Sequence, residues 1–256
     1  MITLAQITDT HLFADKNTLM RGWPTWESLQ AVVQAVAEAQ PDLVLLTGDL
    51  ADQGEGKAYR HLVELLEPLN LPIYWIPGNH DDGSKMANML TGENFCSEKT
   101  FRLGSWRLLL LDSVLVESQI GQGALSEASW QWLENQLENY GDQPTLIALH
   151  HHPLQIGIDW MDMMQLQESE RFQTLIARFR QVKLVIFGHI HAKFLQRLGT
   201  VDYHGTPSTC IQVADLDDEN LPGFRMIHLA EDGTYKTQVQ RVAFAPNRTR
   251  KSTMPH

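Results

Sequence analysis

The sequence predicts an α/β protein in which two mixed β-sheets pack as a sandwich flanked by helices. Three observations support this fold class. Apolar, strand-like runs alternate with helix-periodic segments over about the first 80 residues, as in βαβ units. Some of these runs are apolar at every position, which is typical of strands buried on both faces. Closely spaced strand pairs, typical of hairpins, follow in the middle of the chain and near its end.

The first third of the chain contains three predicted strands separated by two predicted helices. In order they are a strand over residues 2–8, a helix from Thr25 through Val36, a strand over 43–47, a helix around 62–66 and a strand over 73–76. Thr25 is the expected N-cap of the first helix, because its side chain can accept from the free backbone N–H groups. Polar residues follow each strand, at the edge where open α/β sheets place their sites.

The rest of the chain predicts a second series of strands and helices. In order these are strands over 100–103 and 106–112, a helix capped by Ser126, a strand over 145–149, a helix around 172–179, a strand over 184–187, and strands over 194–198, 200–204, 224–230 and 235–242. We expect one domain over residues 1–244, with residues 193–244 completing the sheet or the pocket. Residues 245–256 lack apolar periodicity and predict a flexible tail.

Composition limits the classes of function. The 256 residues carry a formal net charge of −11, which argues against a nucleic-acid or anionic-membrane binder. An anionic substrate would then need a local positive charge, such as a bound metal. No apolar run approaches the ~20 residues of a spanning helix, and we expect no signal peptide because the first residues lack a basic start. Only Cys96 and Cys210 carry thiols, so we expect reduced thiols and a cytoplasmic protein.

Metal-capable side chains follow the predicted strands at several separate positions. They are Asp9, His11, Asp49, Asn79, His80, His150, His189 and His191. The last two belong to a strand followed by Gly-His-Ile-His, a pattern that alone would fit hydrogen-bonded loop histidines equally well. Taken together, carboxylate, carboxamide and imidazole suit Mn, Fe, Zn or Co rather than calcium. The absence of thiolates argues against a structural zinc site.

These residues carry a resemblance to a known family. Asp9-Thr-His11, Gly48-Asp49, Gly78-Asn-His-Asp81, His150-His151 and Gly188-His-Ile-His191 resemble, in order, the five sequence blocks of the calcineurin-like metallophosphoesterases. The resemblance extends from residue 2 to about residue 192. A narrower likeness, in residues 6–13, 25–28, 149–154 and 206–210, is to the bacterial class III 3′,5′-cyclic-AMP phosphodiesterases.

The resemblance implies two divalent metal ions and a cyclic nucleotide as the small-molecule partner. Asp9, His11, Asp49 and His191 would hold the first ion, and Asp49, Asn79, His150 and His189 the second, with Asp49 bridging. A hydroxide shared by both ions would attack phosphorus and convert 3′,5′-cyclic AMP to 5′-AMP. The residues implied in substrate binding are His11, Asp49, Asn79, His80, His150 and His191.

Neighbouring residues of the blocks have less certain roles. By resemblance, His80 is not a ligand but binds a phosphoryl oxygen or gives a proton to the leaving alkoxide. Asp81 is expected either to fix an imidazole tautomer or to be a solvated turn residue. The first histidine after its strand, His150, is the implied ligand, while His151 is unassigned and His152 is expected in the loop or pocket wall.

Outside the blocks, the remaining histidines are expected to have no catalytic role. We expect structural roles for His204 and His228 and a solvated helix position for His61.

Three more residues have open roles. Trp23 and Trp160 lie in predicted loops, where each either packs or stacks on a purine. Arg21 is either a pocket-rim residue or an ordinary surface charge.

Two other functions remain open. The same chemistry could act on glycerophosphodiesters, nucleoside-diphosphate lipids, other cyclic nucleotides or phosphomonoesters, because a two-metal centre recognises only the phosphoryl group. A non-catalytic metal-bound scaffold would predict a broken ligand set, whereas every block is filled. The sequence does not choose among the metals or between a monomer and a homodimer.

Overall fold

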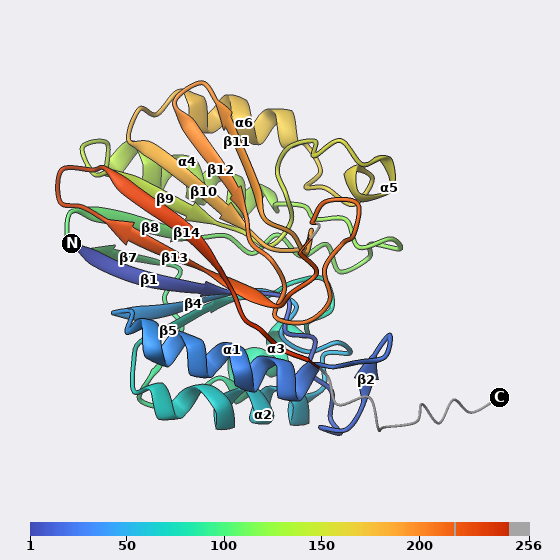
Figure 1. Cartoon of the computed structure of the whole chain (residues 1–256). Coiled ribbons are helices and arrows are strands. Elements are labelled where there is room, and N and C mark those ends of the chain that lie inside the picture. Colours follow the sequence, from blue (N-terminus) through green and yellow to red (C-terminus); the bar gives the residue numbers. More distant parts are fainter. Residues whose placement is uncertain (218, 246–256) are drawn as a thin grey trace.

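The computed structural model describes residues 1–217 and 219–245, and the predicted flexible tail lies outside them from residue 246 on. Two six-stranded sheets face each other, with helices on both outer faces (Figure 1). The predicted fold class is confirmed. That residues 1–244 form one domain stays a prediction.

The first sheet has four parallel strands and an antiparallel pair at one edge. Its strands are, in spatial order, β14 (Tyr235–Arg241), β13 (Gly223–Leu229), β1 (Ile2–Ile7), β4 (Leu43–Thr47), β5 (Ile73–Ile76) and β6 (Phe95–Cys96). Helices α1 (Thr25–Ala39), α2 (Gly56–Leu66) and α3 (Gly83–Met89), with the 3-10 turn Glu67–Leu69, belong to this half of the molecule (Figure 1).

The second sheet has a parallel centre and an antiparallel strand at each edge. Its strands are, in spatial order, β11 (Phe194–Leu198), β12 (Val201–Gly205), β10 (Val182–Phe187), β9 (Thr145–Ala148), β8 (Trp106–Leu110) and β7 (Thr100–Leu103). Helices α4 (Glu127–Asn139) and α6 (Ser169–Ala177) cover its outer face (Figure 1). The short helix α5 (Asp159–Asp162) and the hairpin of β2 (Leu19–Met20) and β3 (Trp23–Pro24) lie at the end of the sandwich.

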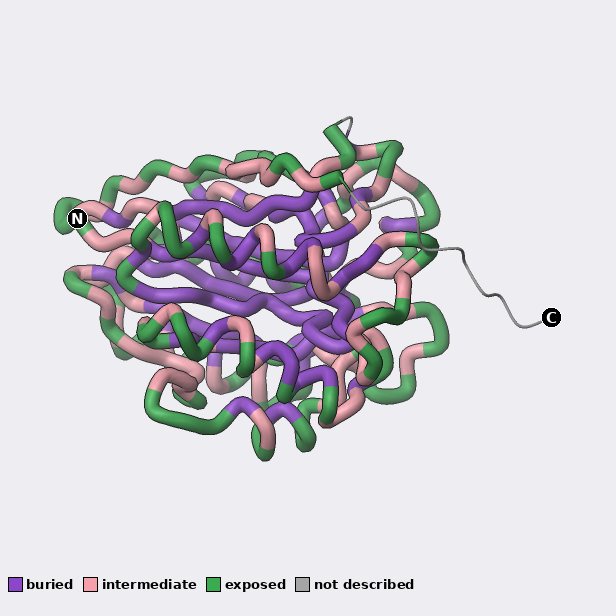
Figure 2. Tube along the Cα trace, turned by 60° about the horizontal axis from the view of Figure 1, so that its bottom comes forward, coloured by how far each residue is buried: buried purple, intermediate pink, exposed green. Residues whose placement is uncertain are grey.

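Three apolar layers explain why the central strands are apolar at every position. In β4, Leu45 packs between the two sheets, whereas Val44 and Leu46 pack under α1 and α2. In β10, Ile186 likewise faces the space between the sheets, and Val185 faces α4 and α6. Figure 2 shows these strands as the buried centre of the molecule. Burial on both faces therefore removes the period-two pattern of a half-exposed strand.

Two local predictions were wrong. Pro24, not Thr25, is the N-cap of α1 and makes no side-chain cap bond, because Thr25 is already inside the helix and buried. His61 is buried rather than solvated, because its ring packs edge-on against Trp26 and its Nδ1 donates to the Phe13 carbonyl at 3.2 Å. Phe13 and Trp26 thus cover a face of α2 that the sequence pattern predicted to be exposed to solvent.

The N-cap at Ser126 is confirmed, since its hydroxyl accepts from the Ser129 N–H. Across the described residues, none of the helices combines the length and the apolar character that crossing a membrane requires.

Candidate active site

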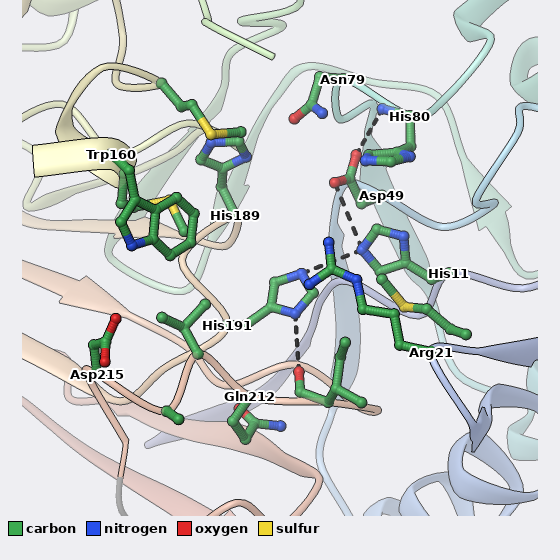
Figure 3. Close-up of a pocket in the computed structure, with 16 residues that line it drawn as sticks. His11, Arg21, Asp49, Asn79, His80, Trp160, His189, His191, Gln212 and Asp215 are labelled. Carbon is green, nitrogen blue, oxygen red and sulfur yellow. Dashed lines mark hydrogen bonds and ion pairs between the residues drawn. The ribbon is translucent and has the colours of Figure 1, made fainter. Parts of the chain in front are cut away.

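The candidate site lies where β1, β4, β5, β9 and β10 end at the same edge of the sandwich (Figures 1 and 3). Its backbone is unusual, because five of its non-glycine residues have positive φ angles. They are Asp9 (54°), His11 (44°), Asp49 (52°), His189 (67°) and His191 (46°). Each such residue costs on the order of 1–3 kcal/mol and persists only where the surroundings enforce it. The strand ends are therefore held in strained turns that aim these side chains inward.

The first group of side chains joins the ends of β1 and β10. The Nε2 atoms of His11 and His191 lie 3.2 Å apart, and His191 Nε2 lies 3.3 Å from Asp9 Oδ1. His11 Nε2 lies 3.7 Å from Asp49 Oδ2. Asp9, His11 and His191 thus form a group with the spacing of metal ligands. We call these three residues, with Asp49, the first cluster.

The second group meets the first at the same carboxylate. His150 Nε2 lies 3.3 Å from Asp49 Oδ2, 3.2 Å from Asn79 Oδ1 and 3.2 Å from His189 Nδ1. We call Asp49, Asn79, His150 and His189 the second cluster. The Oδ2 atom of Asp49 faces an imidazole nitrogen of each cluster, so this one carboxylate joins them.

Backbone carbonyls fix which nitrogen of each ring faces the clusters. His150 Nδ1 lies 2.8 Å from the Thr47 carbonyl, and His191 Nδ1 lies 2.9 Å from the Ile211 carbonyl. A carbonyl only accepts, so both Nδ1 atoms carry hydrogen and donate. Once Nε2 has lost its proton, each ring therefore directs a lone pair from Nε2 into the clusters, as metal-binding histidines do.

The electrostatics of the two clusters favour binding of a cation. Burial opposes charge on His150, but the nearby Asp49 carboxylate outweighs burial and raises the pKa of His150 to about 9. Burial lowers the pKa of His11 and of His189, with the surrounding imidazoles adding to the effect at His189. Buried carboxylates and imidazoles together form a donor set that fits a borderline divalent metal, which would replace the proton on His150.

Two positions in the site require glycine, because the backbone there passes very close to neighbouring side chains. A Cβ at Gly78 would collide with the carboxylate of Asp49, and a Cβ at Gly188 would collide with the Thr8 hydroxyl and the Asp9 carboxylate. Backbone without side chains at these points lets the strand ends approach the clusters.

His80 is exposed at the edge of the clusters and differs from the cluster residues. Its backbone N–H donates to Asp49 Oδ1 at 2.9 Å, and its Nδ1 donates to the Asp52 carbonyl at 2.8 Å. The ring stands edge-on to His11, with centroids 4.8 Å apart. Its spacing to His11 and Asp49 also falls within metal-ligand range.

Asp81 has neither of its predicted roles. Its carboxylate accepts from the backbone N–H of Leu50, Ala51 and Gly78, and from the Tyr59 hydroxyl. Burial, reinforced by Asp49, raises the pKa of Asp81 to about 6. It therefore fastens the loop after β5 to the loop after β4.

Asp52 does fix an imidazole, with its Oδ1 3.1 Å from His11 Nδ1. Asp52 was not among the predicted site residues, although its place three residues after Asp49 was a usable signal.

His151 and His152 lie behind the clusters and are fully buried. His151 Nδ1 lies 2.8 Å from Ser113 Oγ, and His151 has metal-ligand spacing to His150 and His189. His152 stacks on the His189 ring, with centroids 5.6 Å apart, and is not among the cavity-lining residues. His152 is therefore a loop residue packed behind a cluster residue rather than part of the pocket wall.

His204 and His228 occupy structural positions on the strands. They pair across strands with Thr237 and Thr3, at 3.1 Å and 3.0 Å respectively.

A loop that follows β12 supports the first cluster, and sequence reasoning did not assign it this role. Ser208 Oγ donates to the Asp9 carbonyl at 2.7 Å, and the Ile211 carbonyl orients His191. The Gln212 amide donates to the Ser208 and Cys210 carbonyls and so closes the loop. The resemblance in residues 206–210 thus marks support for the site rather than ligands.

A cavity of about 280 Å³ opens above the clusters. It is lined by His11, Met20, Arg21, Asp49, Asn79, His80, Trp160, Met161, Met164, His189, His191, Ile211, Gln212, Val213, Ala214 and Asp215 (Figure 3). Arg21 is exposed at its rim. Trp23 is not among the lining residues and packs against Phe244, with centroids 5.7 Å apart.

A two-sheet sandwich with His, Asp and Asn side chains gathered at its strand ends defines an α/β protein equipped to bind metal ions. The sequence model of the calcineurin-like phosphoesterases matches residues 2–193, and the chain belongs to this family.

Relatives agree with this assignment, and a solved structure has the same fold. The chain is 40% identical to a 3′,5′-cyclic-nucleotide phosphodiesterase of Nostoc sp., over 95% of this chain and 94% of the relative. It is 38% identical to the 3′,5′-cyclic adenosine monophosphate phosphodiesterase CpdA of Escherichia coli K12, over 94% and 90%. A dimetal phosphatase from Danio rerio superposes with a TM-score of 0.72 at 15% identity, covering 94% of this chain and 99% of that one, which shows a shared fold.

Proposed function

We propose that this protein is a metal-dependent phosphodiesterase that hydrolyses 3′,5′-cyclic AMP to 5′-AMP. The observation that carries the proposal is the single Asp49 carboxylate between two clusters of buried ligand atoms, at the floor of a cavity. Support for the substrate comes from the relatives at 40% and 38% identity, which are named as phosphodiesterases of cyclic nucleotides.

We assign two divalent cations to the two clusters. Asp9, His11, Asp49 and His191 would hold the first, and Asp49, Asn79, His150 and His189 the second, with Asp49 shared. We leave out His80, because its ring is exposed and its Nδ1 is already engaged by Asp52. Fe, Mn, Zn and Co all accept such ligands, so the identity of the metals is a matter for experiment.

The mechanism divides the work between the cations and the chain. When bound, the cations would supply positive charge for the phosphoryl oxygens and would acidify a water to serve as the nucleophile. His80 lies at the cavity wall beside the Asn79 amide, where both can contact phosphoryl oxygens. Since Nδ1 of His80 donates to a carbonyl, only a doubly protonated ring has a proton at Nε2 to give to the leaving O3′.

The remaining cluster residues hold this arrangement rather than transfer protons. Asp49 accepts a hydrogen bond from the His80 backbone N–H and so holds His80, the proposed acid, next to the clusters. Of the residues proposed to touch substrate, His11, Asp49, Asn79, His80 and His191 line the cavity, whereas His150 lies just beneath it. The cavity lining therefore gives no support to contact between His150 and substrate.

A substrate panel tests the proposal. Protein stripped of metal is reloaded with Mn, Fe, Zn or Co, and kcat/KM is measured for cyclic AMP, cyclic GMP, a glycerophosphodiester, a nucleoside-diphosphate lipid and a phosphomonoester. We expect no turnover without metal and the highest kcat/KM for cyclic AMP. Turnover by metal-free protein would contradict the mechanism, and a much higher kcat/KM for another diester would replace the substrate.

We further propose a cytoplasmic enzyme, monomeric or homodimeric, that binds neither nucleic acid nor membranes. The free thiols of Cys96 and Cys210 suit a reducing compartment. The net charge of −11 disfavours phosphate-rich polymers and surfaces.

A further inference from the structure

The cavity has an apolar side as well as its two clusters. Trp160, Met161 and Met164 line it from α5 and the residues just after it. Met161 is only 3% exposed and belongs to the core, whereas Trp160 is 45% exposed. Figure 3 shows the indole of Trp160 on the side of the cavity away from His11 and His80. A large aromatic face is thus available to a ligand that already reaches the clusters.

The segment that carries Trp160 is short but well anchored. The Asp162 carboxylate accepts from the backbone N–H of Ile156 at 2.7 Å and of Gly157 at 3.1 Å. The backbone N–H of Leu166 donates to the His152 carbonyl at 3.0 Å, and Met161 is packed in the core. These contacts fix the backbone that carries the indole, so little conformational entropy of this segment remains to be lost on binding.

We propose that Trp160 determines specificity by stacking on the nucleobase of the cyclic nucleotide, an inference that rests on the proposed function. A cyclic nucleotide has an anionic phosphodiester at one end and an uncharged planar base at the other. The cavity presents ligand atoms for cations at one side and an indole face at the other. Its volume of about 280 Å³ is near the lower end of small-molecule sites.

Stacking by Trp160 predicts which class of phosphodiester the site prefers. Every base has a π-face, so stacking on an indole is tolerant of base identity and is worth on the order of 1–3 kcal/mol per base. Trp160 therefore separates nucleotides from phosphodiesters that lack a base, but does not separate adenine from guanine.

A binding cycle tests the inference on metal-loaded protein. Titration calorimetry compares 5′-AMP with ribose 5-phosphate, which lacks the base, for the wild type, Trp160→Ala and Trp160→Phe. The matched control is Met163→Ala, because Met163 is 60% exposed on the same segment but is not among the lining residues. We expect Trp160→Ala to weaken 5′-AMP by about 5- to 150-fold and to leave ribose 5-phosphate nearly unchanged. Trp160→Phe should retain most of the affinity, and Met163→Ala all of it.

The outcomes keep this inference apart from the proposed function. Equal losses for both ligands, or no loss for either, would overturn stacking by Trp160. If the wild type does not hydrolyse cyclic AMP, the proposed function fails, while the binding cycle still decides for or against Trp160. If the wild type hydrolyses cyclic AMP and Trp160→Ala keeps its KM, only the inference about Trp160 fails.

Discussion

The two sides of the cavity are built in opposite ways. At the cluster side, Asp9 and His150 are completely buried and stand at the ends of central strands. At the other side, Trp160 is 45% exposed on a helix of four residues. Reacting groups must be held closely in place, which requires rigid strands and many hydrogen bonds. A side that only recognises an uncharged base can be formed by a short segment at the surface.

The contrast also concerns energy. The cluster side contains positive φ angles at Asp9, Asp49 and His189, together with several buried ionisable groups, so it stores strain and desolvation. The Trp160 side contains an indole that needs no counter-charge. Changes at the cluster side should therefore affect metal binding and chemistry, whereas changes at the Trp160 side should affect only affinity. The following predictions test this division.

The largest effect is expected at Asp49, the carboxylate that joins the clusters. Asp49→Ala should remove bound metal and lower kcat/KM for cyclic AMP by at least about 10³-fold, because metal stabilisation of the transition state amounts to several kcal/mol. Metal content by mass spectrometry and turnover measure this. Asp49→Asn, which still accepts the His80 N–H, controls for misfolding. If Asp49→Ala binds as much metal as the wild type, the assignment of metal binding to the cluster side is wrong.

His80 should affect chemistry while leaving metal bound. We expect His80→Ala to lower kcat for cyclic AMP by about 10²–10⁴-fold, the usual contribution of a general acid. A diester whose leaving group is 4-nitrophenolate needs no proton, so its turnover should fall much less. Equal losses for the two substrates would exclude proton donation by His80, and loss of metal would make it a ligand instead.

The sequence predicted the cluster side far better than the Trp160 side. Central strands such as residues 43–47 and 73–76 were predicted with their observed bounds, because continuous apolar runs are a strong signal. Asp9 and Asp49 follow β1 and β4, which are neighbouring parallel strands of one sheet, so their closeness followed from topology. The approach of His150, which follows β9 of the other sheet, depends on how the two sheets pack.

Features that depend on short elements or on tertiary contacts could not be predicted from the sequence. Helix α5 and the β2–β3 hairpin are too short for any periodicity, so Trp160 and Arg21 could not be placed. Asp81 was misassigned because its partners are backbone N–H groups, which leave no sequence pattern. The burial of His61 likewise depends on a loop that folds over it.

Metal affinity at the second cluster should fall in acid. Asp49 raises the pKa of His150 to about 9, so without metal this ring is protonated below pH 9 and a cation must displace the proton. The lowered pKa of His189 leaves that ring neutral, so it releases none. Affinity should therefore fall about tenfold per pH unit below 9.

Competition with a chelator between pH 7 and 9 measures this slope in zinc-loaded protein. The contribution of the base, taken as the ratio of the affinities for 5′-AMP and ribose 5-phosphate, should stay constant over the same range. A metal affinity independent of pH would show that His150 is not the proton-binding ligand.

The smallest effect is expected at Arg21, which lies between the two sides. It is the only Lys or Arg that lines the cavity in the described part of the chain, and it occupies a tight turn with φ 47° ahead of Gly22 at 85°. Both positive angles are typical of a type I′ hairpin turn, in which Gly or Asn is preferred to Arg. Figure 3 shows its guanidinium reaching toward His11 and His191, where it would face an anionic substrate.

Because this charge is exposed, its effect should be small and sensitive to salt. We expect Arg21→Gln to raise KM for cyclic AMP about two- to fivefold at low ionic strength, with kcat unchanged and with little difference from the wild type in ~1 M salt. Arg180→Gln makes the same change in net charge at an exposed position that is not part of the cavity lining, and should leave KM unchanged. If both variants shift KM equally, the effect is one of net charge, and Arg21 belongs to neither side of the site.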